Sequence, residues 1–228
     1  MKHEGWHNEQ LEESIGRLRK GNTYKNLSTI WIVPTRGKIA DRIINSWMNM
    51  MKPMNQAVVG PIFIRGDEVG VAYNKGIRMI LDNPALRDFK YVLTVEEDNA
   101  PPPDGLLRLF ESINKYDVVG GLYWTKGPEG QPMIYGDPNT MPRNMVPQLP
   151  QQDTVQPCNG LGMGFNLFKL DIFKKMPEPW FSTVQDTQRG QWTQDLWFYN
   201  NLAKIGGKVA CDTRVKVGHY DYDADFMW

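Results

Sequence analysis

The predicted fold rests on one stretch, Phe89–Val95 (FKYVLTV), which is followed directly by Glu96–Asp98 (EED). The apolar and β-branched residues of this stretch predict a buried strand. Ligands of open α/β sheets bind at the carboxyl ends of their strands, where these three acids lie. Adjacent carboxylates repel one another and favour a nearby cation, such as a hard divalent ion shared with substrate phosphates. A solvated acidic turn is an equally weighted alternative.

Further strands and helices alternate on both sides of this stretch. Strands are predicted at 28–33, 57–64, 117–123 and 208–217, and helices near 39–47, 72–81, 106–113, 170–176 and 193–205. A strand is also predicted across 159–168, where glycines alternate with apolar residues. Alternating strands and helices predict an α/β domain with a largely parallel sheet.

The chain divides into a short N-terminal extension, residues 1–27, and a single domain, residues 28–228. Leu11, Ile15 and Leu18 give residues 9–20 the pattern of an amphipathic helix. Residues 125–157 are rich in Pro, Gly, Asn and Gln and predict a long surface loop, of the kind that often forms a functional lid.

Composition narrows the class of protein. The 228 residues include 26 Lys+Arg and 26 Asp+Glu, so no basic excess supports a nucleic-acid-binding surface. Cys158 and Cys211 do not form a CxxC pair, and free thiols are the favoured interpretation. The sequence has no signal peptide or membrane-spanning stretch, which predicts a cytoplasmic protein without stable membrane insertion.

Other candidate residues have both an ordinary and a functional interpretation. His219 follows the last predicted strand, where a lone histidine is more often structural than a metal ligand. Asp195 opens a helix, where a carboxylate is ordinarily favoured by the helix dipole. Gly160, Gly162 and Gly164 either let a ligand come close or allow close internal packing.

Taken in order along residues 28–221, these signals resemble those of the GT-A glycosyltransferases, particularly the family 2-like members. Glu96-x-Asp98 resembles the Asp-x-Asp signature of that family, with Glu in the first position. Thr193-Gln194-Asp195 resembles its Glu-Asp motif, with Gln194 in place of the first acid. His219 matches a late metal-ligand histidine. The chain is also loosely similar to short viral glycosyltransferase domains of compact build.

The resemblance implies a GT-A type fold, with a Rossmann-like, mixed, mostly parallel sheet flanked by helices. It implies a metal-dependent transfer of a sugar from a nucleotide diphosphate donor, with a UDP-sugar favoured. Asp98 and His219 would hold Mn²⁺ or Mg²⁺, Glu96 would face the ribose or a metal-bound water, and Asp195 would be the base of an inverting reaction. The residues assigned to the donor are Pro34, Thr35, Arg36, Asp67, Asn74, Glu96, Glu97, Gly160 and Gly162.

Several alternatives stay open at this point. The acceptor is a glycan, a glycolipid, a protein or a hydroxymethylated base of viral DNA. A sugar-nucleotide pyrophosphorylase (a nucleotidyltransferase) is a second class, although the turn Pro34–Lys38 is short and poor in glycine for it. A non-catalytic carbohydrate- or nucleotide-binding module is a third. Trp124, Trp180 and Trp192 are candidates for stacking on a sugar or base, with burial in the core as the equal alternative.

Overall fold

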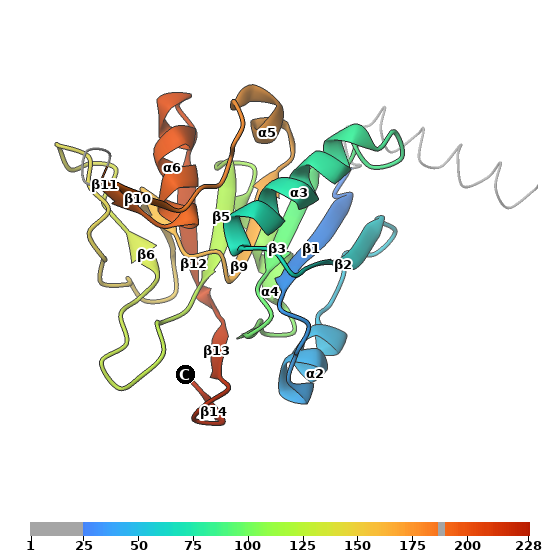
Figure 1. Cartoon of the computed structure of the whole chain (residues 1–228), viewed down its shortest axis with the longest axis horizontal. Helices are drawn as coiled ribbons and strands as arrows, with labels where there is room; N and C mark the ends of the chain where they lie inside the picture. The colour runs from blue at the N-terminus through green and yellow to red at the C-terminus, as the bar shows by residue number, and fades with distance from the viewer. Residues whose placement is uncertain (1–24, 187–189) are drawn as a thin grey trace, which may run out of the picture.

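A computed structural model describes residues 25–186 and 190–228, and its main feature is a seven-stranded sheet (Figure 1). In spatial order the strands are β2 (Val58–Arg65), β1 (Thr29–Thr35), β3 (Tyr91–Val95), β9 (Phe165–Lys169), β5 (Val118–Leu122), β12 (Val209–Lys216) and β7 (Val155–Cys158). β1 is parallel to β2 and β3, and β12 is parallel to β5. β9 and β7 are antiparallel to their neighbours. The predicted fold class, a mixed and mostly parallel α/β sheet, is confirmed.

Strand β1 shows why the sequence forms a sheet with two covered faces. It is buried almost throughout, as expected for a parallel strand covered on both sides. Ile30 and Ile32 face one core cluster, whereas Trp31 and Val33 face the other. The period of two that separates these pairs is the side-chain period of a strand.

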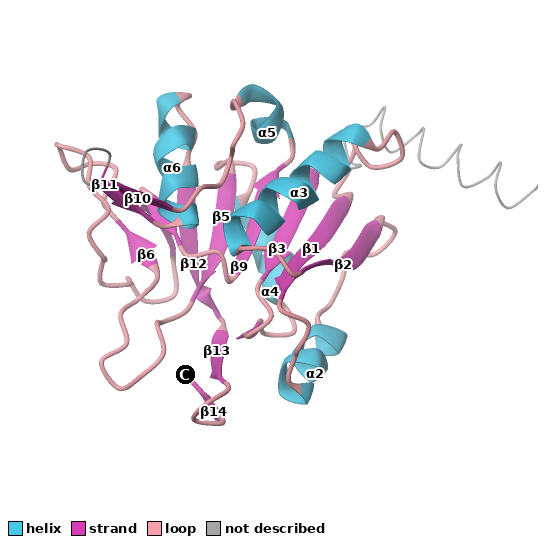
Figure 2. Ribbon diagram, in the orientation of Figure 1, coloured by secondary structure: helices cyan, strands magenta, loops and turns pink. Residues whose placement is uncertain are grey.

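Helices cover both faces of the sheet (Figure 2). One core cluster contains apolar residues of α3 (Val69–Asp82), α5 (Asp171–Lys175) and α6 (Gln194–Lys204). The other contains residues of α2 (Asp41–Asn49) and α4 (Gly105–Ser112). In Figure 1, α3, α5 and α6 lie in front of the sheet and α4 lies behind it.

Two predicted segments differ from the structure. Residues 125–157 are not one loop, because β6 (Ile134–Tyr135) pairs with β8 (Gly160–Leu161) and β7 forms an edge of the main sheet. The predicted strand across 159–168 is divided into β8 and β9. Strands of two to four residues show too little periodicity to be recognised in a sequence.

Other short strands were also missed. β4 (Asn99–Ala100), β13 (Gly218–Asp221) and β14 (Phe226–Met227) form a three-stranded sheet. β10 (Val184–Asp186) and β11 (Gly190–Trp192) pair with each other. The β4–β13 pairing has a functional consequence, because it brings His219 opposite Asn99, the residue after the acidic triplet.

The remaining predictions about the chain have different outcomes. The helix predicted at residues 9–20 lies outside the described residues, and the boundary between the extension and the domain stays a prediction. Cys158 and Cys211 are free and buried, which agrees with the predicted thiols. Within the part of the chain that the structure describes, no helix has the length and apolar character needed to cross a membrane.

Candidate active site at the ends of the parallel strands

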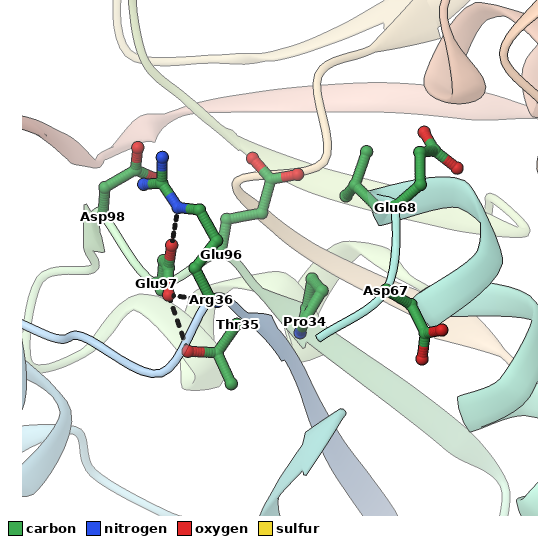
Figure 3. A pocket seen from close by; sticks show the side chains of 9 residues that line it. Pro34, Thr35, Arg36, Asp67, Glu68, Glu96, Glu97 and Asp98 are labelled. Carbon is green, nitrogen blue, oxygen red and sulfur yellow. Dashed lines mark hydrogen bonds and ion pairs between the residues drawn. The ribbon is translucent and has the colours of Figure 1, made fainter. Parts of the chain in front are cut away.

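A pocket of about 330 Å³ opens where β2, β1 and β3 end (Figure 3). Because these three strands are parallel neighbours, the residues that follow them meet at one edge of the sheet. The pocket is lined by Pro34, Thr35, Arg36, Asp67, Glu68, Val69, Glu96, Glu97 and Asp98. Seven of these nine residues were predicted to bind the donor or a metal, so the structure brings most of the predicted site together.

Glu97 fixes the turn that follows β1. Its Oε2 accepts hydrogen bonds from the Thr35 hydroxyl at 2.6 Å and from the Arg36 backbone N–H at 2.9 Å. Its Oε1 accepts from Arg36 Nε at 2.5 Å. The dashed lines in Figure 3 mark these contacts. The Glu97 side chain is buried, so these charge-assisted bonds hold the end of β1 against the end of β3.

Replacing Glu97 should loosen this turn. We expect Glu97→Gln to lower the free energy of unfolding by roughly 1.5–3 kcal/mol, because a buried acceptor of charge-assisted bonds is lost. Urea unfolding followed by circular dichroism measures the change. The matched control is Glu129→Gln, since Glu129 is exposed. Equal stability of the two variants would show that Glu97 does not hold the turn.

Glu96 faces a different environment from Glu97. Its Oε1 accepts from the Tyr73 hydroxyl at 3.2 Å. Burial, together with the charges of Asp98 and Asp195, raises the pKa of Glu96 to about 8, and the Tyr73 bond and Lys126 oppose this only in part. Glu96 is therefore a carboxyl group that can carry a proton at neutral pH in the metal-free protein.

The raised pKa of Glu96 predicts how stability depends on pH. The unfolded chain releases this proton near the ordinary value of 4.5, whereas the folded chain keeps it until about pH 8. The folded state therefore binds more protons between these values, and the contribution of Glu96 to stability declines as pH rises. Relative to the wild type, we expect Glu96→Gln to be more stable at pH 8.5 than at pH 4.5. Urea unfolding in metal-free buffer at both values tests this, and a pH-independent difference would contradict it.

Asp98 and His219 lie side by side, as the resemblance implied for two metal ligands. Tyr220 N–H donates to the Asp98 carbonyl at 2.7 Å, and this holds β13 against the acidic triplet. His219 Nε2 lies 3.5 Å from Asp98 Oδ2. Lys126 Nζ lies 2.6 Å from the same Oδ2. Although burial opposes it, the His219 ring and the Lys126 ammonium lower the pKa of Asp98 to about 2.

The chemistry of this pair suits a divalent cation. His219 Nδ1 lies 2.8 Å from the Trp124 carbonyl oxygen, and because a carbonyl only accepts, Nδ1 carries the proton. In the neutral ring, the form that binds a metal, Nε2 then presents its lone pair on the side of Asp98, and such an orienting contact at Nδ1 is typical of metal-binding histidines. Among the described residues no third His, Cys, Asp or Glu completes a cluster. Two ligands leave most of the coordination positions of a hard divalent cation to other donors.

Asp195 lies in the first turn of α6 and outside the lining of the 330 Å³ pocket. It is buried, and burial raises its pKa. One carboxylate oxygen, Oδ1, accepts from Leu196 N–H at 2.8 Å and from the Thr193 hydroxyl. Its charge contributes to the raised pKa of Glu96. Its predicted role as a base stays a prediction.

The structure gives three other predicted residues internal contacts. The Asn74 amide bonds to the backbone of Gly70 and Phe181 and lies outside the pocket lining. A Cβ on Gly162 would lie 2.2 Å from the Tyr123 hydroxyl, so that ring fills the space the glycine leaves. Gly160 packs beside Tyr199. Internal packing accounts for the two glycines, and donor contacts for all three residues stay predictions.

The three tryptophans that were candidates for stacking on a sugar or base have different environments. Trp180 is buried and donates to the carbonyls of Phe173 and Met176, so it belongs to the core. Trp124 is partly exposed, and its backbone carbonyl contacts the His219 ring. Trp192 lies in β11 and is partly buried.

Sequence reasoning missed Lys126 and Tyr222. Lys126 comes just after the end of β5, so the same rule about strand ends that pointed to the acids could have found it. Tyr222 lies near the C-terminus and donates to the Glu97 carbonyl at 3.2 Å and the Lys38 carbonyl at 3.1 Å. No periodic pattern marks a contact of that kind.

Comparisons with known proteins support the fold. No protein-family model and no curated protein sequence matches the chain. Among solved structures, the chain is similar to A197 from STIV, with a TM-score of 0.63 and 18% identity over 88% of this chain and 92% of that one. It also matches S. aureus TarS 1-349, solved in complex with UDP-GlcNAc, with a TM-score of 0.47 and 13% identity over 81% of this chain and 55% of that one. The sheet topology and the likeness to A197 give the chain a GT-A-like fold.

Proposed function

We propose that the chain is a glycosyltransferase that takes a sugar from a nucleotide diphosphate donor, with a UDP-sugar as the favoured donor. One observation carries the proposal. The acidic triplet lies in a pocket at the carboxyl ends of parallel strands, and Asp98 in that triplet faces a histidine from a distant part of the chain. This combination fits a site for a nucleotide, its phosphates and a hard cation.

The donor nucleoside would lie against the turn after β1. Thr35 and Arg36 are held in place by Glu97, and Asp67 approaches from the end of β2. A preorganised turn costs less ordering on binding than a flexible one. Glu96, with its raised pKa, would meet the ribose or a metal-bound water at the inner wall of the pocket.

Asp98 and His219 would hold Mn²⁺ or Mg²⁺. When bound, the ion would neutralise the charge that develops on the departing diphosphate. Other residues of the chain fix the positions of these two ligands. Trp124 fixes the His219 ring through Nδ1, and Tyr220 holds the backbone of Asp98.

Asp195 would act as the general base of an inverting transfer. The acceptor hydroxyl oxygen forms a bond to the anomeric carbon while the bond from that carbon to the donor phosphate oxygen breaks. The bonding electron pair leaves with the nucleoside diphosphate, and the hydroxyl proton passes to the Asp195 carboxylate. Its raised pKa makes this carboxylate a better proton acceptor than an exposed aspartate.

A screen of sugar nucleotides tests the proposal. We expect slow hydrolysis of at least one UDP-sugar that requires Mn²⁺ or Mg²⁺ and releases UDP. Acceptors would then be screened with that donor, taking a glycan, a glycolipid, a protein and hydroxymethylated DNA in turn. Formation of a nucleoside triphosphate and a sugar phosphate from donor and pyrophosphate would instead identify a pyrophosphorylase. Binding of a donor without any turnover would identify a binding module.

A further inference from the structure

We propose that Lys126 is a second cation for the donor diphosphate, which neutralises Asp98 while the site is empty and moves to the phosphates when metal and donor bind. This inference rests on the proposed function. It assigns a role to a residue that lies outside the acidic triplet and the motifs of the sequence. It also explains how one carboxylate can serve both an internal ion pair and a metal.

The contact between Lys126 and Asp98 is close and partly shielded from water. Nζ lies 2.6 Å from Oδ2, and the two side chains are only 30% and 15% exposed. His219 Nε2 reaches the same oxygen at 3.5 Å. Lys126 therefore occupies the oxygen that the proposed metal would share with His219.

The loop that carries Lys126 is closed by its own hydrogen bonds. Thr125 N–H donates to the Gln131 carbonyl at 2.9 Å, and Gln131 N–H donates to the Thr125 hydroxyl at 2.8 Å. The preceding residue, Trp124, offers its carbonyl to His219. One short segment thus contacts both candidate metal ligands, so the fold of the loop keeps the backbone of Lys126 close to them.

A divalent ion and this ammonium cannot both stay on Oδ2. Like charges a few ångströms apart repel one another, and the repulsion doubles when one of the two ions is divalent. Lys126 must therefore leave Asp98 when the metal binds. Its side chain is long and flexible, and a displaced ammonium needs a new anion.

The surroundings of Lys126 show where it can go. A second pocket, of about 700 Å³, shares Arg36 with the donor pocket and is lined by Lys126, Lys38, Tyr222, Asp221 and Asp223. Asp98 lies at the donor-pocket side of Lys126. Asp221 and Asp223 are carboxylates of the same pocket, and a diphosphate bound at Asp98 would add a further anion within reach of the ammonium. Lys126 would then support the negative charge that the leaving group gains.

Two titrations of Lys126→Met test the inference. In donor-free protein, we expect calorimetry to show that Mn²⁺ binds at least about tenfold more tightly to the variant, because a competing positive charge is gone. At saturating Mn²⁺, we expect UDP to bind roughly tenfold more weakly, because a phosphate contact of that strength, about 1.4 kcal/mol, is lost. A lysine with only a structural role would not give changes of opposite sign.

Matched variants make the result specific. Lys38→Met removes a lysine from the same pocket that is exposed and forms no part of the Asp98 ion pair, and we expect both affinities to stay near the wild-type values. Lys126→Arg keeps the charge and should bind Mn²⁺ like the wild type. Thermal melting confirms that each variant is folded. Mn²⁺ affinity that is unchanged or weaker in Lys126→Met, or unchanged UDP affinity, overturns the inference.

The proposed function and this inference fail in different ways. If no sugar nucleotide is turned over by the wild type, the proposed function fails, whereas the effect of Lys126→Met on Mn²⁺ affinity can still be measured. If the wild type turns over a donor and Lys126→Met binds Mn²⁺ and UDP as the wild type does, only the inference about Lys126 fails.

Discussion

Asp195→Asn should retain donor and metal binding but lose sugar transfer by roughly 10²–10⁴-fold, the usual contribution of a general base. The amide is nearly the size of the carboxylate, so the packing around the start of α6 should survive. An amide oxygen can still accept from Leu196 N–H, as the Asp195 carboxylate does. The loss should therefore appear in turnover with little change in donor affinity.

A matched control separates catalysis from helix electrostatics. Asp171 also lies in the first turn of a helix, but it is exposed, and it follows β9, which is antiparallel to β3 and so ends at the opposite edge of the sheet from the pocket. If Asp195 only complements the helix dipole, Asp195→Asn and Asp171→Asn should each cost roughly 0.3–1 kcal/mol of stability and leave transfer unchanged. Transfer rates and melting temperatures of both variants decide the matter. Normal transfer by Asp195→Asn would remove the main reason for preferring inversion.

The long elements of the sheet could be predicted because each has a strong pattern. β1 and β3 are continuous apolar runs, and the helices between the strands bury residues at helical spacing. Parallel neighbours place their carboxyl ends together, which is why the turn after β1 and the acids after β3 could be expected to meet. The short strands β4 and β13 have no such pattern, yet their pairing is what brings His219 to Asp98.

The acidic triplet was expected to need a nearby cation because adjacent carboxylates repel one another, and two of its members are paired with cationic side chains of the chain itself. Glu97 is buried against Thr35 and Arg36, and Asp98 is paired with Lys126. Glu96 has the raised pKa that burial and the charges of Asp98 and Asp195 produce. The three acids differ because successive side chains point in different directions and contact different parts of the chain. These tertiary contacts cannot be read from a single sequence.

The glycine-rich segment could be recognised as unusual, but its reason could not be predicted. Gly162 and Gly164 make room for the ring of Tyr123, and Gly164 N–H donates to the Tyr123 hydroxyl at 3.0 Å. A glycine that admits a ligand and one that admits an internal side chain look the same in a sequence. The two interpretations separate only when the neighbour that fills the space is known.

Asp98→Ala should abolish the strengthening of UDP binding by Mn²⁺, because His219 alone is too little to hold the ion. If the Asp98 charge only repelled the neighbouring acids, its removal would leave the free energy of unfolding unchanged or higher. The structure predicts the opposite, a loss of roughly 1–3 kcal/mol, since Lys126 is left without its partner in a partly buried site. Calorimetric titration of UDP with and without Mn²⁺, together with urea unfolding, measures both effects.

The control is Asp104→Ala, which breaks an ion pair with Arg108 outside the pocket and should leave UDP binding and its response to Mn²⁺ unchanged. If Mn²⁺ still strengthens UDP binding to Asp98→Ala, the metal assignment is wrong. If the variant also unfolds at the wild-type urea concentration, the ion pair with Lys126 contributes nothing to the fold.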